Sequence, residues 1–565
     1  MPVLRRNCLA AAAVAAAIHL VLLVLCFDCV SSETIRRNSS SRNSRNDNAN
    51  GNESCLEQSE HPDRMTSFPG WDQPLPSAWY SGYLEYELEG QTVHTHYVLV
   101  QAEDHEGTET DLPLIYWSNG GPGASSLFGL LTEIGPLLLS DESLDTDAYK
   151  KTGIPTPVYN PYAWNRLGSL LMIDQPAPVG FSYCNDDDVK NATSHSCGGI
   201  TWTDELASLN SYTALRTFYE TKFPCLREKD LYLTGESYGG IYIPTLARRI
   251  VEGNDNSKDG NATLGLKGFA VGDGCLGVDT DMCGVLGSSG AADYWHLWFM
   301  AGHHQIPLSD FRKILKACSH SDTPGFLWSN SEKDDLCRAA LAKAKKEVGG
   351  FFEYALYDEC TYRNGLEWKK KLGLGPGVLG GALNDYPCGA GPVLEEYLKL
   401  GPVISEAFHV RSAFFEVDNA IGFDYVPTEP DLQPFYKAMN GRLKILVYNG
   451  DTDPAITSFA TQNWTSHLGF DQDQSWRPWT VDGCQQMGGY VERYGGMFDF
   501  LTIRGAGHMV PTYKPAASFA FLKAWLHGED YPVFDANCTS PPSSKHDHET
   551  SRSRSSSTEV DVEVQ

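Results

Sequence analysis

The feature that most constrains the fold of this chain is a repeated alternation of short apolar runs with helical segments. The apolar runs end in glycine-containing loops that carry polar residues, as in "DLPLIYWSNGG", "DLYLTGESYGG", "RLKILVYNGDTD" and "FDFLTIRGAGHMVP". The intervening "ELASLNSYTALRTFYETKFP" has apolar residues at helical spacing and stops at Pro224. Buried strands that alternate with helices predict an α/β fold with a mostly parallel central sheet, helices on both faces, and a site at the strand ends.

Residues 275–439 interrupt this alternation. They contain helical stretches such as "LSDFRKILKACS" and no comparable series of strands, and strand signals resume after them. We therefore interpret residues 275–439 as a largely helical insertion lying over the sheet, and not as a separate domain. The core of the fold is expected in two parts, residues 71–274 and residues 440–540.

Both ends of the chain have the composition of segments outside the folded core. Residues 1–31 combine Arg5 and Arg6 with a long apolar run, which is typical of a secretory signal peptide. Because this run is longer than the usual signal core, an uncleaved membrane anchor is the alternative. Residues 32–70 and 541–565 are mostly polar, so we expect a disordered linker or pro-segment and a disordered tail.

Cysteine usage and glycosylation sequons also indicate the secretory pathway. Of the 15 cysteines, three lie in the predicted signal and an even number remains, without the spacing of zinc-binding motifs, so disulfides are favoured. Pairing Cys184 with Cys197, or Cys275 with Cys283, would close short loops, although the connectivity stays open. Sequons typical of a glycoprotein occur at Asn38, Asn52, Asn191, Asn261, Asn463 and Asn537.

The formal net charge of −28 limits the expected partners of the chain. An acidic body repels nucleic acids and anionic membranes, so neither is expected to bind, and no stable membrane association is expected unless the signal is retained. The same acidity is compatible both with simple solubility and with adaptation to an acidic compartment.

One of the polar loops carries a serine in the pattern of a nucleophile. Residues 235–239 fit G-x-S-x-G, in which a sharp strand-to-helix turn exposes the serine oxygen, here that of Ser237. An acid and a histidine follow in the order of α/β-hydrolases: Asp453, with Asp451 as its rival, and then His508 in "GAGHMVP". The imidazole would take the serine proton, and the aspartate would hold the imidazole in the correct tautomer.

A second loop, residues 117–126 ("WSNGGPGASS"), follows an earlier strand and is rich in glycine. An oxyanion hole needs N–H donors fixed at the position where negative charge develops in the reaction. We therefore expect this loop to lie beside the serine and to contribute backbone amides to the site.

Together these motifs resemble a known family. "WSNGGPGASS", "EIGP", "NPYAWNRLGSLLMIDQPAPVGFSY", "LTGESYGGIYIP", "VYNGDTD" and "GAGHMVP" are similar to the ordered motifs of the serine carboxypeptidases, from about Tyr80 to Leu526. The resemblance implies an α/β-hydrolase fold in which the helical insertion forms the cap. It also implies removal of single residues from peptide and protein C-termini at acidic pH, through an acyl-enzyme, with no metal or other cofactor.

The resemblance also implies the roles of individual residues. By motif position, Ser237 is the nucleophile, His508 the base and Asp453 the acid. The backbone amides that bind the oxyanion are those of Gly121 and Tyr238. The residues that hold the terminal carboxylate of the substrate are Asn119, Gly120, Glu133 and Glu236.

The position of Glu236 beside the nucleophile needs a physical reason, because a negative charge there would oppose the oxyanion. Two carboxyl groups close together cannot both ionise cheaply, so Glu133 and Glu236 are expected to share a proton. The protonated pair would donate hydrogen bonds to a C-terminal carboxylate, whereas the ionised pair would repel it. Activity is therefore expected to fall as the pH rises.

Two further positions bear on the cap and on specificity. The family loop usually carries cysteine where this chain has Ala124, so a disulfide from that loop to the cap is not expected. Met509 follows the histidine, where family members that favour basic terminal residues tend to have an acid. An apolar leaving residue is therefore expected.

Three functions are compatible with these motifs. A carboxypeptidase comes first because every catalytic position is filled. An acyltransferase or lyase that uses the same triad comes second, and a non-catalytic binding or protective protein comes third. The sequence leaves open the choice between vacuole, lysosome and exterior, and it leaves open a homodimer.

Overall fold

The computed structural model describes most of the predicted core and parts of the insertion. The described residues are 61–103, 112–185, 197, 199–257, 263–280, 282–283, 291–318, 335–358, 391–411, 423–495 and 497–538. The predicted signal peptide, the predicted tail and the sequons at Asn38, Asn52, Asn191 and Asn261 lie outside them. Within these ranges, no helix has both the length and the apolar character needed to cross a membrane.

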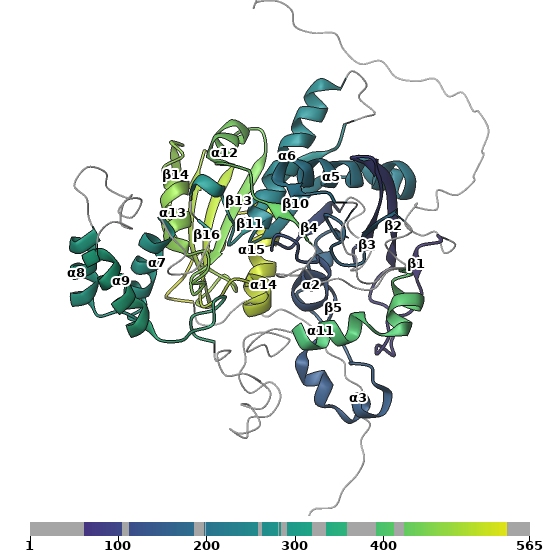
Figure 1. Cartoon of the computed structure of the whole chain (residues 1–565), viewed down its shortest axis with the longest axis horizontal. Coiled ribbons are helices and arrows are strands. Elements are labelled where there is room, and N and C mark those ends of the chain that lie inside the picture. Colours follow the sequence, from purple (N-terminus) through teal and green to yellow (C-terminus); the bar gives the residue numbers. More distant parts are fainter. Residues whose placement is uncertain are drawn as a thin grey trace, which may run out of the picture. The chain divides into compact units, whose positions relative to one another are not determined.

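A large mixed sheet forms the centre of the fold (Figure 1). Six adjacent strands run parallel, in the order β7 (Ser169–Ile173), β4 (Leu114–Ser118), β10 (Leu231–Glu236), β11 (Leu266–Gly272), β13 (Lys444–Gly450) and β16 (Phe498–Ile503). Antiparallel strands extend both edges: β3 (Gln91–Val100), β2 (Trp79–Leu88), β1 (Arg64–Met65) and β8 (Tyr183–Cys184) on one side, and β15 (Met487–Tyr494) and β14 (Gln472–Thr480) on the other. The parallel centre confirms the predicted α/β class.

Apolar side chains of the central strands alternate between two cores, one on each face of the sheet. Leu114 and Tyr116 of β4 enter one core, and Ile115 and Trp117 enter the other. The first core is covered by α5 (Asp204–Thr217), α6 (Gly239–Asn256), α12 (Gln433–Met439) and α13 (Ser458–Ser466). The second is covered by α2 (Leu127–Gly129), η1 (Leu130–Ile134), α14 (Val510–Tyr513) and α15 (Pro515–His527). This arrangement confirms the prediction of helices on both faces.

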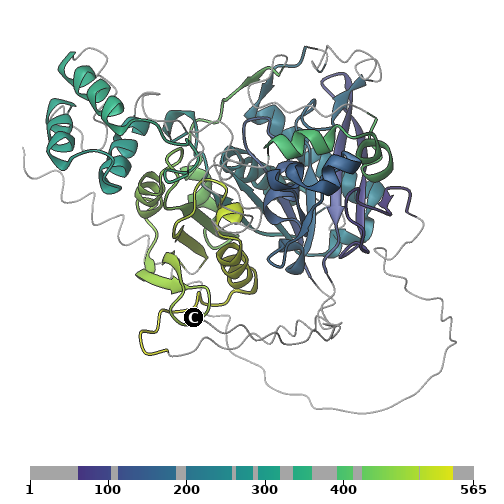
Figure 2. The same ribbon diagram turned by 90° about the horizontal axis from the view of Figure 1, so that it is seen from below.

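The segment predicted as an insertion divides into separate groups. Helices α7 (Ala291–Gly302), α8 (Leu308–Cys318) and α9 (Asp335–Val348) share a small apolar core of their own. Helix α11 (Gly391–Leu398) and η9 (Val403–Ala407) instead join the core of α15, and both views place them apart from α7–α9 (Figures 1 and 2). Helix α12 packs against the sheet itself, because Phe435 stacks on Phe269 of β11.

Short elements connect these layers. They are β5 (Leu137–Leu138), η2 (Asp141–Asp145), α3 (Asp147–Thr152), β6 (Val158–Tyr159), η3 (Trp164–Arg166), β9 (Trp202–Thr203), η4 (Phe218–Lys222), η5 (Pro224–Glu228), η7 (Val278–Thr280) and β12 (Tyr425–Val426). Strand β12 pairs with β9, and this pairing returns the insertion to the start of α5.

Part of the predicted linker is ordered. The expectation that residues 32–70 are disordered is wrong for residues 61–70, because β1 pairs with β2 there. Met65 and Phe68 are buried, and the Phe68 ring packs against Trp79 and Tyr397. These two apolar side chains gain enough burial to order the end of an otherwise polar segment.

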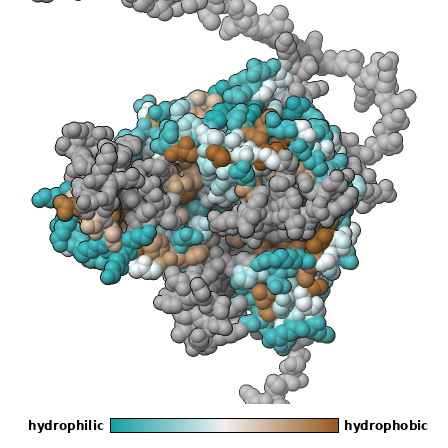
Figure 3. Space-filling view, in the orientation of Figure 1, coloured by the Kyte–Doolittle hydropathy of each residue, from teal (hydrophilic) through white to brown (hydrophobic). Residues whose placement is uncertain are grey.

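The described cysteines form disulfides at sites where the sequence had left the pairing open. Cys184 bonds to Cys197, and Cys275 bonds to Cys283. Two further pairs are Cys318 with Cys337, which joins α8 to α9, and Cys484 with Cys538. On the face shown in Figure 3, the coloured residues are mostly hydrophilic, and the apolar ones lie in several separate groups.

Candidate active site

Ser237 lies in a tight turn between β10 and α6. Its φ of +59° is in the left-handed region, and the turn leaves its side chain only partly buried. The loop after β11 holds this turn: the Ser237 N–H donates to the Gly272 carbonyl, and the Cys275 N–H donates to the Ser237 carbonyl, both at 3.0 Å. The predicted strand-turn-helix geometry is therefore present, with the serine at the carboxyl ends of the parallel strands.

His508 and Asp453 form a buried pair near the same edge of the sheet. His508 Nδ1 lies 2.7 Å from Asp453 Oδ2. Since Nδ1 faces a carboxylate, it carries the proton, and Nε2 is left as an acceptor. Nε2 is buried and has no hydrogen-bond partner among the described residues, so it is available to a serine hydroxyl.

The geometry separates Asp453 from its rival Asp451. Asp453 accepts hydrogen bonds from the N–H groups of Ala455 (2.8 Å) and Ile456 (3.2 Å), which direct one carboxyl oxygen toward His508. Asp451 instead accepts the N–H of Gly505 at 2.6 Å. The arrangement favours Asp453 as the acid, and the catalytic roles themselves stay predictions.

Asp273, at the end of β11, is a site residue that the sequence analysis missed. It is fully buried, and its Oδ1 accepts hydrogen bonds from Asn449 Nδ2 and from the Gly450 N–H, both at 3.0 Å. Burial, and then the neighbouring Asp453 carboxylate, raise its pKa well above the ordinary value for aspartate. It follows the strand in "FAVGDG" just as the predicted residues follow theirs, and this signal could have identified it.

Ligand atoms of Asp273, Asp453 and His508 lie within 4.8 Å of one another. Two carboxylates and an imidazole are a donor set that a divalent cation accepts. Here, however, His508 and Asp453 are hydrogen-bonded to each other, and both carboxyl groups accept backbone N–H groups. We therefore interpret the group as a hydrogen-bonded acid cluster.

The loop after β4 packs directly against the serine turn. A Cβ atom on Gly120 would lie 2.4 Å from the Tyr238 nitrogen and 2.6 Å from the Ser237 Cβ, so only glycine permits this approach. In the described part of the chain, neither the Gly121 N–H nor the Tyr238 N–H donates to another backbone group. The Tyr238 side chain is anchored by donation of its hydroxyl to Asp204 at 2.7 Å. Both N–H groups thus lack a backbone acceptor there, as an oxyanion donor requires, and their role as oxyanion donors stays a prediction.

Asn119 joins the two predicted carboxylate-recognising acids. Its Nδ2 donates to Glu133 Oε1 at 3.1 Å and to Glu236 Oε1 at 3.0 Å. Its Oδ1 accepts from Trp117 Nε1 (2.8 Å) and from the Gly129 N–H (2.9 Å), so the amide has one orientation. The amide thereby holds the two glutamates against each other.

The environment of Glu133 and Glu236 favours their protonated forms. The side chains are 1% and 4% exposed. Burial raises the pKa of Glu133 to about 7, and burial together with Glu133 raises the pKa of Glu236 well above its ordinary value. The second carboxyl oxygen of each residue is buried and accepts no hydrogen bond from the described residues. The raised pKa values and the common contact with Asn119 support the expectation of a shared proton, which stays a prediction.

The insertion contributes Tyr354 to this site, which the sequence analysis also missed. The backbone N–H of His508 donates to the Tyr354 carbonyl at 2.8 Å, and the ring centroids of the two residues lie 4.9 Å apart. Met509, predicted to contact the leaving residue, is only 6% exposed. No local pattern marks Tyr354, because its contact joins segments that are far apart in the chain.

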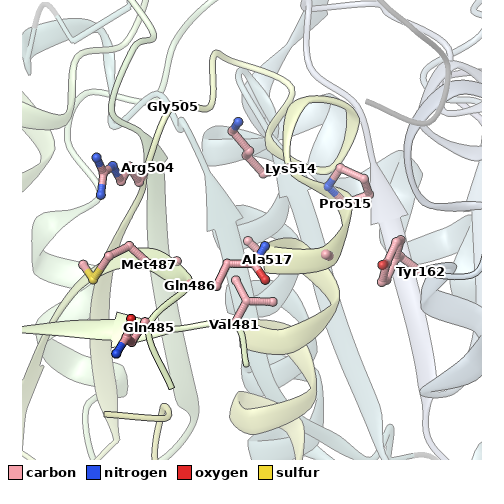
Figure 4. Close-up of a pocket in the computed structure, with 12 residues that line it drawn as sticks. Tyr162, Val481, Gln485, Gln486, Met487, Arg504, Gly505, Lys514, Pro515 and Ala517 are labelled. Atoms are coloured by element: carbon pink, nitrogen blue, oxygen red, sulfur yellow. The ribbon is translucent and has the colours of Figure 1, made fainter. Parts of the chain in front are cut away.

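A separate cavity of about 670 Å³ lies between β15 and the start of α15 (Figure 4). Met487 and Arg504 line one side, and Lys514 and Tyr162 line another. None of the predicted site residues lines this cavity. The predicted catalytic residues therefore lie outside this cavity.

Comparison with known proteins agrees with this geometry. The chain matches the serine carboxypeptidase family model over residues 69–528. It is 30% identical over 492 residues to the putative serine carboxypeptidase-like 30 of Arabidopsis thaliana, covering 82% of this chain and 89% of that protein. It is 29% identical over 507 residues to the lysosomal protective protein of Mus musculus, covering 83% of this chain and 94% of that protein.

A solved structure is also similar. It is KEX1(delta)p, a prohormone-processing carboxypeptidase from Saccharomyces cerevisiae, with a TM-score of 0.61 and 20% identity over 83% of this chain and 96% of that one. At this level of identity, the likeness shows the α/β-hydrolase fold alone.

Proposed function

The chain belongs to the serine carboxypeptidase family and is a serine-type carboxypeptidase, and from this premise we propose that it releases the C-terminal residue of peptides and proteins through an acyl-enzyme on Ser237. Ser237 Oγ attacks the carbonyl carbon of the last peptide bond while its proton passes to His508 Nε2. The N–H groups of Gly121 and Tyr238 bind the oxyanion.

His508 then completes both halves of the reaction. The imidazolium donates its proton to the leaving nitrogen, the peptide C–N bond breaks, and the acyl group stays on Ser237. A water molecule loses a proton to His508 and attacks the ester, which releases the acid and restores the serine. Asp453 stabilises the imidazolium in each half through its hydrogen bond to Nδ1.

The observation that carries this proposal is the position of the Asn119–Glu133–Glu236 group beside the serine turn. Glu236 directly precedes Ser237, all three side chains are buried, and Asn119 donates hydrogen bonds to both glutamates. Protonated carboxyl groups donate hydrogen bonds to a carboxylate, and the Asn119 amide can add another. A site that recognises a free C-terminal carboxylate beside the nucleophile restricts cleavage to the last peptide bond.

The leaving residue is proposed to be apolar. Met509 directly follows His508, the Tyr354 ring centroid lies 4.9 Å from that of His508, and neither side chain offers a negative charge to a basic leaving residue. Peptides ending in Phe or Leu are therefore expected to be better substrates than peptides ending in Lys or Arg.

An acidic compartment of the secretory pathway, a lysosome or vacuole, or the exterior is the proposed location. Disulfides in the described core are typical of proteins that fold in oxidising compartments. The similar mouse protein is lysosomal by name. The raised pKa of Glu133 gives a working range below about pH 7.

The test compares an N-blocked dipeptide with its C-terminal amide from acidic to neutral pH, with Ser237→Ala as the control. Acid-side release of the terminal residue from the free carboxylate substrate, lost in the variant, supports the proposal. If folded protein cleaves neither substrate, the peptidase proposal is wrong. Acyl transfer from an activated ester to an alcohol would then support the acyltransferase alternative.

A further inference from the structure

Asp273 connects the nucleophile to the acid of the proposed triad. Strand β11 lies between β10 and β13, so the loop at its end touches the loops after both neighbours. Gly272 and Cys275 hold the backbone of Ser237 on one side. On the other side, the Asp273 N–H donates to the Tyr448 carbonyl at 2.8 Å, and its carboxyl group accepts the Gly450 N–H.

The carboxyl groups of Asp273 and Asp453 lie against each other in a site that excludes water. Both side chains are 0% exposed, and a carboxyl oxygen of each lies within 4.8 Å of the other. Two ionised carboxylates in this position would require a cation, because an unpaired buried charge is very costly. Among the described residues, the titratable groups recorded near Asp273 are Asp453, Glu236, His508 and Tyr448, and none of these is lysine or arginine.

Hydrogen bonding decides which of the two carboxyl groups keeps the proton. Asp453 accepts three donors: the N–H groups of Ala455 and Ile456, and His508 Nδ1. Asp273 accepts two: Asn449 Nδ2 donates to Oδ1, and the Gly450 N–H is shared between Oδ1 at 3.0 Å and Oδ2 at 3.3 Å. The carboxylate with more donors is the one that stays ionised. The proton therefore belongs to Asp273, in agreement with its raised pKa.

We propose that Asp273 is a positioning residue of the reaction, a neutral carboxylic acid that donates a hydrogen bond to Asp453 and keeps this carboxylate aligned with His508. The proposal rests on the proposed role of Asp453 as the acid of the triad. With Asp273 neutral, Asp453 is the single negative charge beside the imidazole, and this charge stabilises the imidazolium during acyl transfer. When Asp273 ionises at higher pH, the hydrogen bond is lost, Asp453 is repelled, and the serine becomes less reactive.

The test uses the reaction of Ser237 with phenylmethanesulfonyl fluoride, followed from about pH 5 to about pH 9. The reagent has no carboxylate, so Glu133 and Glu236 do not recognise it. Asp273→Asn keeps an N–H donor of the same shape and cannot ionise, and Asp273→Leu removes the donor. We expect Asp273→Asn to react within about threefold of the wild type at acidic pH and to keep its rate further into the alkaline range. Asp273→Leu is expected to react about tenfold or more slowly than the wild type over the whole pH range.

Two results would overturn the proposal: an alkaline decline in Asp273→Asn identical to that of the wild type, or equal rates in Asp273→Asn and folded Asp273→Leu. If Asp273→Leu does not fold, the pH profile of Asp273→Asn decides alone, because a merely structural role would not move it. Absence of labelling of wild-type Ser237 would contradict the proposed function instead. Labelling with an unchanged profile in Asp273→Asn would contradict only the role of Asp273.

Discussion

Four buried carboxyl groups gather around one histidine in this protein. Glu133, Glu236, Asp273 and Asp453 are each at most 4% exposed. Burial and the neighbouring carboxylates raise the pKa values of two of them: Glu133 and Asp453 act on Glu236, and Asp453 and Glu236 act on Asp273. Only one negative charge is balanced when His508 becomes an imidazolium. The other carboxyl groups are therefore most useful as neutral donors of hydrogen bonds.

Replacing Glu236 by Gln should extend activity on carboxylate substrates toward higher pH. The variant cannot form the doubly ionised pair that repels a C-terminal carboxylate. In the wild type, kcat/KM for an N-blocked dipeptide should fall by up to about tenfold per pH unit above about pH 7, and this fall should be smaller in the variant. The amide of the same dipeptide is the control. A pH profile that the substitution leaves unchanged would rule out the shared-proton explanation.

Asp453→Asn should lower kcat by about 10⁴-fold, because an amide favours the wrong tautomer of His508. Asp451→Asn is the matched control, since Asp451 contacts Gly505 and not the imidazole. It should keep kcat within about threefold. Steady-state hydrolysis of the blocked dipeptide measures kcat for both variants. A larger loss of kcat in Asp451→Asn than in Asp453→Asn would make Asp451 the acid of the triad.

At the scale of elements, the strand order brings the site together. Strands β4, β10, β11 and β13 are consecutive in the sheet and run parallel, with Gly235 opposite Ser118 and Glu236 opposite Gly272. The loops after these strands therefore open at one edge. The insertion closes part of that edge through Tyr354, while α12 returns the chain to the sheet.

Gly120→Ala tests the close packing of two of these loops. The added methyl group would meet the Tyr238 nitrogen and the Ser237 Cβ, so the loop after β4 must move and the predicted oxyanion donors separate. Loss of a donor position should lower kcat by about 10²- to 10³-fold. Gly401→Ala is the control, because a Cβ at Gly401 meets nothing within 4 Å. Circular dichroism would check the fold, and normal turnover in a folded Gly120→Ala protein would contradict the packing argument.

For the whole molecule, both the net charge and the buried acids favour the folded state at acidic pH. The net charge of −28 applies at pH 7, and it becomes less negative as carboxylates gain protons, which reduces the repulsion within the folded protein. Glu133 has an ordinary pKa of 4.5 that burial raises to about 7 in the folded protein. Between these values the folded state holds a proton that the unfolded state has lost, so the free energy of unfolding decreases as the pH rises.

The melting temperature should therefore be higher at about pH 5 than at about pH 7.5, by about 2 °C or more. The double variant Glu133→Gln with Glu236→Gln should reduce this difference, whereas Glu396→Gln, at an exposed position, should not. Differential scanning calorimetry at both pH values measures the effect. Equal pH dependence in the wild type and the double variant would show that the buried pair does not hold its proton in the folded state.

The sequence by itself determined the alternation of strands and helices, the turn at Ser237, and the order of the serine, the acid and the histidine. These features are local: apolar runs and a glycine-lined turn carry their information in neighbouring residues. The α/β fold inferred from them is confirmed. The roles assigned to Ser237, Asp453 and His508 await the experiments above.

Only the tertiary structure decided which distant side chains meet. Asp273 reaches Asp453 because β11 lies between β10 and β13, and Tyr354 reaches His508 because the insertion returns over the strand ends. The same holds for Met65, which pairs with Trp79 in the sheet, and for Phe68, which packs against Trp79 and Tyr397. These contacts depend on the burial and strand order of the complete fold, which no short stretch of sequence encodes.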